Sequence, residues 1–557
     1  MSSRYALSIL HFNIEFVAGD IATYHMNVKE SLEPLLNVLL ENPTWKTDIE
    51  MQGLYIEILK ENYPETLEKL RKLVNRKQVE LVSAHYSDQI YVAYPRYDLL
   101  KSIDINDKIL EENGLKRSNV FLTQENFFTP AVTKVIKEKG YDIALINHTY
   151  YDYFHKIDPE KIKPLYKLDK LYIVMSGPES QWLIPLKENG IQWVWWWYDD
   201  GEPLMTLHGP YSFEKFKHTK LKEDRMKIIL SGLERQGYRL ETISNFVKEI
   251  VEKGYRPEKL KMPLEGAWNM KRCEGVYRWM GHYHNPWELD VQIRSLTYTS
   301  RKYVLAAEKL IKNVKDTWIN TESLEKLLEE AWRFQLRAEC SDPTGWSPKP
   351  NEVGYSITMA RLAQYYSLKI IEDVKKELRY EKILIDTWTG EIKEIKEMPK
   401  KYRKTSLPIQ LEYIGTKPSI SSYLVEENVY LIKYSFKPQE KYAGFMIPIK
   451  TSKIYYSRAL AEEELYELDL DSYDFDHVYL PLTNGLISFT EQDFIIKNNE
   501  KMHIAAKIDK NLMKIGFIVE NAPQQLVFDW EFYYVKGNKE KALKKALEIN
   551  VYPKLIV

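Results

Sequence analysis

The most suggestive reactive residue in the sequence is a glutamate, Glu125. It follows the apolar run 120–122 and lies between Gln124 and Asn126, whose amide groups can orient a carboxylate by hydrogen bonding. A carboxylate at a strand end suits glycosidic-bond chemistry, because retaining enzymes use one carboxylate as the nucleophile and a second one as the acid/base. The local pattern also fits an ordinary solvated loop glutamate, so this residue alone does not decide the function.

Further polar residues lie at or near the ends of other predicted strands, or beyond them. In a parallel β/α barrel, reactive groups lie just after the strands, on the carboxyl-terminal rim. The candidates are His11, Glu80, His85, His148, Asp199, Asp200, Glu234 and Asp342. The pair Asp199–Asp200 precedes Gly201 and is more typical of a turn than of a catalytic acid.

The sequence offers little sign of a bound metal or cofactor. His11, His85 and Asp88 could together bind a metal, but their dispersed spacing is weak evidence for such a site. A glycine-rich phosphate-binding loop does not follow any of the predicted strands. We therefore expect neither a metal nor a cofactor.

The aromatic content is unusually high, with 40 Tyr, 14 Trp and 18 Phe. Flat rings with a polar handle suit stacking against sugar rings as well as core packing. Trp268 lies near Glu265 and Trp346 near Asp342, and in a glycosidase these two rings are candidate sugar-stacking surfaces. The run Trp195–Trp197 could form a second platform, although strand alternation would bury at least one of its rings.

The first half of the chain alternates short apolar strands with helical segments. The strands are expected at 5–12, within 48–59, and at 79–83, 119–122, 141–147, 171–175 and 227–231. The helices are expected at 30–40, 65–75, 99–112, 130–139 and 240–253. This alternation is typical of βαβ units and a parallel sheet. Seven or so units over residues 1–284 favour a closed or nearly closed β/α barrel over an open doubly wound sheet.

Two different patterns follow the barrel. Residues 285–378 show apolar positions at three- and four-residue intervals, which predicts helices at 300–313, 321–339 and 352–376. Residues 379–557 read as strands separated by turn residues, at 383–388, 409–414, 429–436, 444–449, 477–480, 504–508, 514–519 and 526–534. The second half of the chain is therefore a helical segment followed by an all-β, sandwich-like domain.

Charge and cysteine usage narrow the partners and the compartment. The 79 Lys+Arg and 80 Asp+Glu residues give a net charge of −1, which argues against binding nucleic acid or an anionic membrane. Two cysteines give no disulfide framework, and neither a signal peptide nor a spanning segment is evident. We expect a cytoplasmic protein with a carbohydrate substrate, which could also form a homo-oligomer. Few Cys and many Lys, Glu, Ile and Tyr hint weakly at a heat-adapted source.

Several ordered segments resemble glycoside hydrolase family 57, the α-amylase and 4-α-glucanotransferase family. The segment 121–130 is similar to the family's nucleophile motif W-L-x-E-R-V-[WY]-x-P and carries Glu125 at the nucleophile. His11 stands where the first motif places a histidine after strand one. The resemblance covers roughly residues 5–370 and implies an incomplete (β/α)7 barrel with a helical segment behind it.

The resemblance also implies residues that bind the sugar. The segment 77–86 resembles G-Q-[LI]-E-[IL]-[VL]-G-G-G-[YF] and carries over its glutamate as Glu80. The segment 339–342 resembles the fifth motif, whose aspartate, here Asp342, helps to shape the donor subsite. With His11, His85, His148, Trp268 and Trp346, these residues form the expected substrate-binding set.

The family's fourth motif, a segment like G-D-x-E-x-F-G after a barrel strand, carries the general acid/base. Its counterpart here looks like the segment 231–237, where Glu234 fits the glutamate but Gly232 stands in place of the aspartate. Without a proton donor the leaving oxygen must depart as an alkoxide, and general acid catalysis is typically worth about 10²–10⁴-fold. The candidates for a relocated acid are Glu234 and then Asp200.

Three hypotheses follow. The first is a retaining glycoside hydrolase or transglycosylase acting on α-linked gluco-oligosaccharides or polysaccharides, with Glu125 as the nucleophile. The second is a catalytically degraded barrel that serves as a carbohydrate-binding or scaffold subunit, suggested by Gly232. The third and weakest is a metal-dependent deacetylase-like or mannosidase-like barrel that uses His11.

Overall fold

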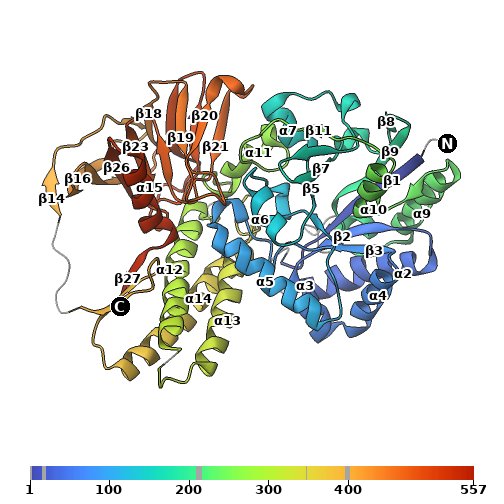
Figure 1. Cartoon of the computed structure of the whole chain (residues 1–557), viewed down its shortest axis with the longest axis horizontal. Helices are drawn as coiled ribbons and strands as arrows, with labels where there is room; N and C mark the ends of the chain where they lie inside the picture. Colours follow the sequence, from blue (N-terminus) through green and yellow to red (C-terminus); the bar gives the residue numbers. More distant parts are fainter. Residues whose placement is uncertain are drawn as a thin grey trace. The chain divides into compact units, whose positions relative to one another are not determined.

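The computed structural model describes residues 3–15, 21–207, 216–285, 287–315, 317–345, 348–395 and 402–557 (Figure 1). The chain divides into two compact units, each of which is considered by itself. The first unit comprises residues 1–89 and 99–271, and the second comprises residues 90–98 and 272–557. None of the helices in the described ranges is long and apolar enough to cross a membrane.

The first unit contains a six-stranded sheet in the order β3-β2-β1-β9-β8, with β10 pairing beside β1. The strands are β1 (Ser3–Phe12), β2 (Thr47–Met51), β3 (Val79–Val82), β8 (Leu186–Glu188), β9 (Ile191–Asp200) and β10 (Arg239–Leu240). All neighbours pair in parallel except β8, which is antiparallel to β9. The strand β1 is central because its run Tyr5–Leu10 is apolar except for one serine and fully buried.

A second sheet in the same unit has the order β11-β6-β7-β5-β4. Its strands are β4 (Val120–Phe121), β5 (Ile143–Ile146), β6 (Tyr166–Leu168), β7 (Leu171–Met175) and β11 (Glu258–Lys259). The strands β4, β5 and β7 are parallel. A parallel bridge between Leu81 of β3 and Arg117, just before β4, links the two sheets. The unit is therefore a parallel α/β structure, as predicted.

Helices separate these strands along the chain. They are α1 (Ile21–Met26), α2 (Glu33–Glu41), α3 (Gly53–Asn62), α4 (Pro64–Asn75), α5 (Arg96–Glu112), α6 (Val132–Glu138), α7 (His148–His155), α8 (Glu202–Met205), α9 (Lys220–Arg235), α10 (Ile243–Glu252) and α11 (Met270–Cys273). The helices predicted from periodicity match α2, α4, α5, α6 and α10 closely.

Two sequence predictions in this unit are wrong. Residues 227–231 are not a strand but lie inside α9, because Met226, Leu230 and Leu233 recur at helical spacing and bury one face. The pair Asp199–Asp200 is not a turn but ends the strand β9. Trp196 is an extra residue in β9, because Leu7 of β1 pairs with Trp195 and the next residue, Ser8, pairs with Trp197. Both Trp195 and Trp196 are buried.

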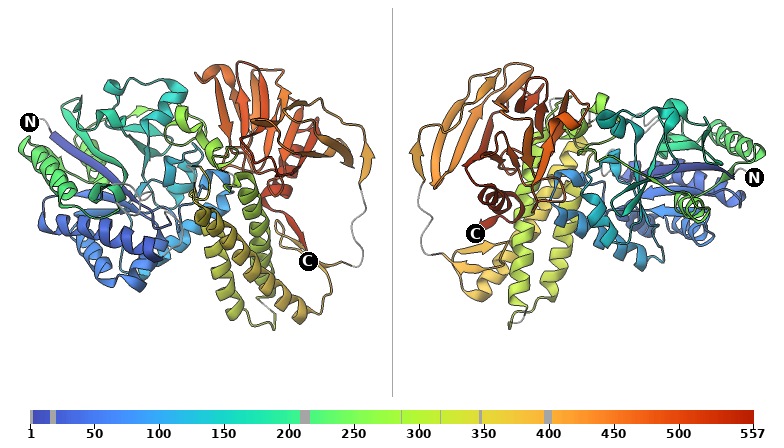
Figure 2. Two further views of the ribbon diagram at one scale, coloured as in Figure 1. Left: turned by 180° about the vertical axis from the view of Figure 1, so that it is seen from behind. Right: turned by 45° about the horizontal axis from the view of Figure 1, so that its top comes forward.

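The second unit begins with three long helices, α12 (Asp290–Val314), α13 (Glu322–Ala338) and α14 (Pro350–Leu378). Figure 2 shows them side by side as a bundle. Apolar residues of the three helices pack against a three-stranded antiparallel sheet and share one hydrophobic core with it. The sheet consists of β13 (Ile392–Glu394), β12 (Ile383–Asp386) and β27 (Lys554–Ile556). The helical prediction for this region is confirmed.

The rest of the second unit is two antiparallel sheets. The larger has the order β14 (Arg403–Thr405), β16 (Ser419–Glu426), β17 (Val429–Phe436), β26 (Phe528–Lys536), β23 (Asp493–Lys497), β22 (Leu486–Ser488), β19 (Lys453–Tyr456), β20 (Tyr466–Asp469). The smaller has the order β15 (Glu412–Ile414), β18 (Tyr442–Pro448), β25 (Lys514–Glu520), β24 (Ala506–Asp509), β21 (His477–Leu480). Phe445 of β18 stacks on Phe532 of β26 at 4.9 Å between ring centroids, so the sheets share an aromatic core. A short helix, α15 (Lys539–Ala546), packs on the larger sheet.

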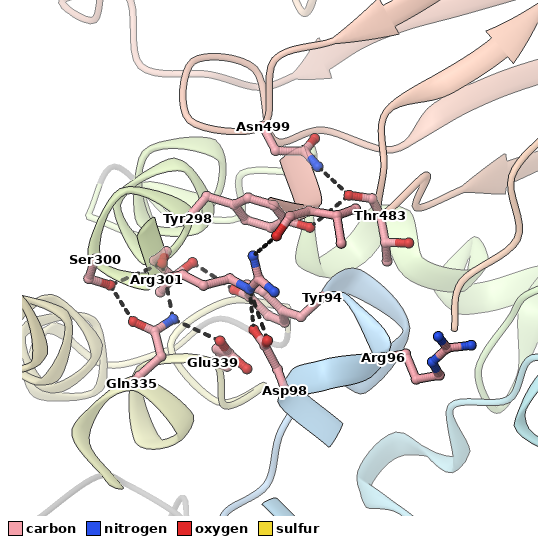
Figure 3. Close-up of polar contacts among 12 residues, drawn as sticks. Tyr94, Arg96, Asp98, Tyr298, Ser300, Arg301, Gln335, Glu339, Thr483 and Asn499 are labelled. Atoms are coloured by element: carbon pink, nitrogen blue, oxygen red, sulfur yellow. Dashed lines mark hydrogen bonds and ion pairs between the residues drawn. The ribbon is translucent and has the colours of Figure 1, made fainter. Parts of the chain in front are cut away.

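A buried ion pair holds the segment 90–98 in the second unit. Arg301 of α12 donates to both carboxylate oxygens of Asp98 at 2.6–2.9 Å. The two side chains are only 1 % and 0 % exposed. Figure 3 shows this pair within a polar network that also contains Tyr94, Tyr298 and Gln335. Arg301 also donates to the carbonyl of Val551, so one guanidinium joins three segments that are distant in the sequence.

We predict that Asp98→Asn destabilises the second unit by about 3–5 kcal/mol, because it leaves the buried charge of Arg301 uncompensated. Urea denaturation followed by far-UV circular dichroism measures this as an earlier midpoint. The matched control is Glu322→Gln, which breaks the exposed pair of Glu322 with Lys326 on α13 and leaves the midpoint unchanged. Equal midpoints for the two variants would contradict the importance of the buried pair.

Candidate active site

Three polar residues form one row across the carboxyl ends of adjacent parallel strands. His11 of β1 is in register with Glu50 of β2 on one side and with Asp200 of β9 on the other. Residues in register on parallel strands point to the same face of a sheet. The pairing of β1 therefore brings together an imidazole and two carboxyl groups that are far apart in the sequence.

His11 is held by Glu50. Its Nδ1 atom contacts the Oε2 atom of Glu50, whose side chain is fully buried. The other ring nitrogen, Nε2, is buried and has no hydrogen-bond partner among the residues that the structure describes. Burial alone would lower the pKa of His11, but the charge and hydrogen bond of Glu50, aided by Asp88 and Asp200, hold that pKa well above its usual value. This shift favours the charged imidazolium, with Glu50 at Nδ1 and a buried Nε2–H on the other side of the ring.

Three carboxyl groups at or just after the end of β9 have raised pKa values. Burial, and then the neighbouring charge of Asp200, raises the pKa of Asp199 to about 7. Burial also raises the pKa of Asp200, and burial and Asp200 together raise the pKa of Glu202 to about 8. The backbone N–H of Asn13, the residue directly after β1, donates to the carboxyl group of Glu202 at 2.7 Å and so fixes its position. Groups with such pKa values are suited to donate a proton.

Glu125 lies on a strained turn directly after β4. Its φ is 56° and that of Asn126 is 49°, so two consecutive non-glycine residues adopt the left-handed conformation. Such backbone costs energy and occurs preferentially at functional sites. The indole N–H of Trp268 donates to the Glu125 carboxylate, and the backbone N–H of Trp268 donates to the Glu125 carbonyl at 3.0 Å. Both the position and the orientation of this carboxylate are thus fixed.

A side-chain hydrogen bond connects the Glu125 turn to β9. The hydroxyl of Tyr198 donates to Oδ1 of Asn126 at 2.6 Å. Asn126 follows Glu125, and Tyr198 precedes Asp199 and Asp200. Because β4 and β9 belong to different sheets, this bond joins the carboxyl edges of the two sheets and brings the Glu125 turn next to the acidic end of β9.

Two predicted site residues lie elsewhere in the unit. Glu80 is near the amino end of β3, where Ser244 and Thr242 at the start of α10 donate to its carboxylate at 2.5 and 3.1 Å. Glu234 is on α9, and its carboxylate accepts hydrogen bonds from Thr44 and Trp45, both at 2.9 Å. The structure brings neither residue into the row formed by His11.

The other predicted residues have mixed positions. His85 is fully buried after β3, and burial lowers its pKa. His148 begins α7 after β5, and burial lowers its pKa as well. Asp342 belongs to the second unit, in the turn after α13, while Trp346 lies outside the described residues. Of the tryptophan run, only Trp197 is partly exposed, beside the ring of Trp182 at 5.6 Å.

Sequence reasoning missed two members of the site, Glu50 and Glu202. Nothing in the local sequence of β2 marks Glu50, since its importance comes from its register with His11. A signal for Glu202 was present, because Asp200-Gly201-Glu202 has the Asp-x-Glu order of the family's fourth motif and begins at the last residue of a strand. The alignment of that motif with residues 231–237 is corrected, since that segment is the end of a helix.

No group of three or more His, Cys, Asp or Glu residues within the described ranges has a geometry that could hold a metal ion. The clustered side chains of this site instead bond to one another. Gln52 illustrates this, because its amide donates to Asn13 at 2.9 Å and also to Asp88.

We predict that Glu50→Gln lowers the pKa of His11, because it removes the largest favourable charge next to the imidazolium. The pH titration of the His11 ring protons by NMR measures this directly. The folded-state pKa of His11 lies above its unfolded value of about 6.5. The stabilisation from the pair is therefore complete below that value and lost as the pH rises through the folded-state pKa. An unchanged titration of His11 in the variant would contradict the assigned contact.

Comparisons with known proteins find sequence relatives for part of the chain. Residues 7–255 match the sequence model of glycosyl hydrolase family 57. The chain is 29 % identical over 157 residues to an alpha-amylase of Pyrococcus furiosus, covering 28 % of this chain and 24 % of that protein. It is 25 % identical over 199 residues to a 4-alpha-glucanotransferase of Thermococcus litoralis, covering 33 % and 30 %. The chain thus spans about a quarter to a third of the length of these relatives.

The fold of the whole chain also has a solved counterpart. An alpha-mannosidase from Enterococcus faecalis superposes with a TM-score of 0.60 at 9 % identity, covering 100 % of this chain and 90 % of that one. At this identity the likeness concerns the fold alone. The segment 7–255, most of which belongs to the first unit, is therefore similar to glycosyl hydrolase family 57.

Proposed function

We propose that the protein is a retaining glycoside hydrolase or transglycosylase that acts on α-linked gluco-oligosaccharides or polysaccharides. The family and the two relatives named alpha-amylase and 4-alpha-glucanotransferase support the class of substrate. The observation that carries the proposal is the tie between the strained Glu125 turn and the acidic end of β9 through Asn126 and Tyr198. A retaining mechanism requires two carboxyl groups, and this contact supports the choice of Glu125 and Asp200 for them.

In this proposal Glu125 is the nucleophile. Its carboxylate attacks the anomeric carbon as the glycosidic C–O bond breaks, forming a covalent glycosyl-enzyme that water or an acceptor hydroxyl then resolves. The Trp268 indole donates to the Glu125 carboxylate, which orients it. The indole ring also offers an apolar face to the sugar.

Asp200 is the proposed acid/base in preference to Glu234. Burial raises the pKa of Asp200, which favours the protonated form that a general acid requires, and Asp200 lies in register with His11 at the end of β9. Glu234 is an unsuitable donor. It lies on the helix α9, and its carboxylate already accepts hydrogen bonds from Thr44 and Trp45. His11, with its N–H directed away from Glu50, is proposed to bind a sugar hydroxyl.

Further residues and boundaries extend the proposal. His85, His148, Asp342 and Trp346 are proposed to complete the substrate-binding set. Glu80 is the weakest member, since its carboxylate caps the start of α10. We also propose that the two sheets form an incomplete barrel of seven parallel strands in a domain of residues 1–284, followed by a helical segment, 285–378, and a sandwich, 379–557.

Glu125→Gln is expected to abolish turnover of maltoheptaose while leaving its binding intact, because the amide keeps the shape but cannot form the glycosyl ester. Chromatography of the products measures turnover, and isothermal titration calorimetry measures binding. In Glu125→Gly, added azide is expected to restore part of the activity with an activated substrate. Full activity in Glu125→Gln would refute the assignment of the nucleophile.

Asp200→Asn and Glu234→Gln distinguish the two candidate acids. The first is expected to reduce kcat/KM on maltoheptaose by about 10²–10⁴-fold, because the leaving oxygen loses its proton donor. The loss should be much smaller on a substrate with a nitrophenolate leaving group, which departs without protonation. The second variant is the control and should keep nearly full activity, and the reverse pattern would reassign the acid to Glu234.

The alternative is a catalytically degraded barrel that binds carbohydrate without cleaving it. Gly232 suggested this reading, but the segment around it is helical and Asp200-Gly201-Glu202 offers the missing aspartate. The purified protein decides between the two. Product formation from maltoheptaose supports the enzyme, whereas binding without any turnover across pH 4–9 supports the degraded barrel.

A further inference from the structure

The exposed face of the small sheet β13-β12-β27, in the second unit, carries an aromatic pair. The antiparallel register of β12 with β27 pairs Asp386 with Lys554, and its continuation places Trp388 opposite Tyr552. The two rings lie 5.5 Å apart between centroids, at an interplanar angle of 31°. Trp388 is 38 % exposed, while Ile383, Ile385 and Leu555 turn to the core on the other face.

The turn that presents Trp388 is rigid. The carboxylate of Asp386 accepts from the backbone N–H groups of Trp388 and Thr389 at 2.9 and 3.1 Å. The hydroxyl of Thr387 donates to the carbonyl of Pro553 at 2.8 Å, which fastens the turn to the strand beside it. A large apolar ring held outward by a fixed backbone loses little entropy when it binds a ligand.

Two opposite-charge pairs flank the rings. On one side Lys554 lies 3.1 Å from Asp386. On the other, the Tyr552 hydroxyl donates to Glu463 at 3.2 Å, and Glu463 pairs with Arg96 at 3.0 Å. The Arg96 and Glu463 side chains are 39 % and 37 % exposed, so their remaining hydrogen-bonding capacity faces solvent. The charges cancel, which suits a neutral ligand rich in hydroxyl groups better than an ion.

We propose that Trp388 and Tyr552, with Glu463 and Arg96 beside them, form a second carbohydrate-binding site that takes a neutral α-glucan chain. One sugar ring stacks on the exposed indole face, and its hydroxyls bond to the carboxylate and the guanidinium. The choice of an α-glucan rests on the proposed function. A site of this kind holds a polymer on the second unit without taking part in bond cleavage.

Native electrophoresis in gels that contain amylopectin tests this site on the full chain. The wild-type protein is expected to be retarded, and Trp388→Ala to lose at least three-fold in apparent affinity. Trp318→Ala is the matched control, because Trp318 is 76 % exposed in the α12–α13 connection and is not part of the proposed site. Its retardation should equal that of the wild type. Thermal melting checks that each variant folds. If Trp388→Ala does not fold, Tyr552→Leu replaces it as the test variant.

The outcomes separate this site from the proposed activity. Turnover of maltotriose should be the same in Trp388→Ala as in the wild type, because a short substrate does not need a second site. Equal retardation of wild type and Trp388→Ala, equal loss in Trp318→Ala, or no retardation of the wild type would overturn the second site. If Trp388→Ala loses retardation while no protein cleaves maltotriose, the site stands and the proposed activity fails.

Discussion

The candidate active site depends on the register of one buried strand. The strand β1 pairs in parallel with both β2 and β9, and that pairing sets His11 level with Glu50 and Asp200. A shift of one residue would turn each of these side chains to the opposite face of the sheet. The apolar run before His11 prevents such a shift, because it is buried along its length. The hydrophobic packing of β1 therefore fixes the geometry of a polar site.

The site also connects the two sheets of the first unit. The strands β4 and β9 belong to different sheets and do not pair with each other. The Tyr198–Asn126 hydrogen bond crosses from β9 to the turn after β4, and Trp268 reaches Glu125 from a third segment. These contacts hold Glu125 and Asn126 in a backbone conformation that non-glycine residues rarely adopt. The surrounding hydrogen bonds offset that strain, and the result is a preorganised carboxylate rather than a mobile loop.

Much of the fold, and part of the site, could be predicted from local sequence. The strands Val429–Phe436 and His477–Leu480 have the predicted bounds because alternation and turn residues mark them clearly. Residues 227–231 failed because a short apolar run in an amphipathic helix looks like a buried strand. Glu125 could be proposed from its sequence neighbours, whereas Glu50 could not, because its contact with His11 exists only through the pairing of β2 with β1. Asp200 was undervalued because two aspartates before a glycine resemble a turn.

The central claim is that Glu125 forms a covalent bond to the sugar. A fluorinated α-glucosyl fluoride that forms the glycosyl-enzyme faster than it is resolved would trap this intermediate, and mass spectrometry of a peptic digest would locate it. The account predicts one added glycosyl group on the peptide that contains Glu125, and none in Glu125→Gln. A label on another carboxylate, or inversion of the anomeric configuration in the product, would contradict it.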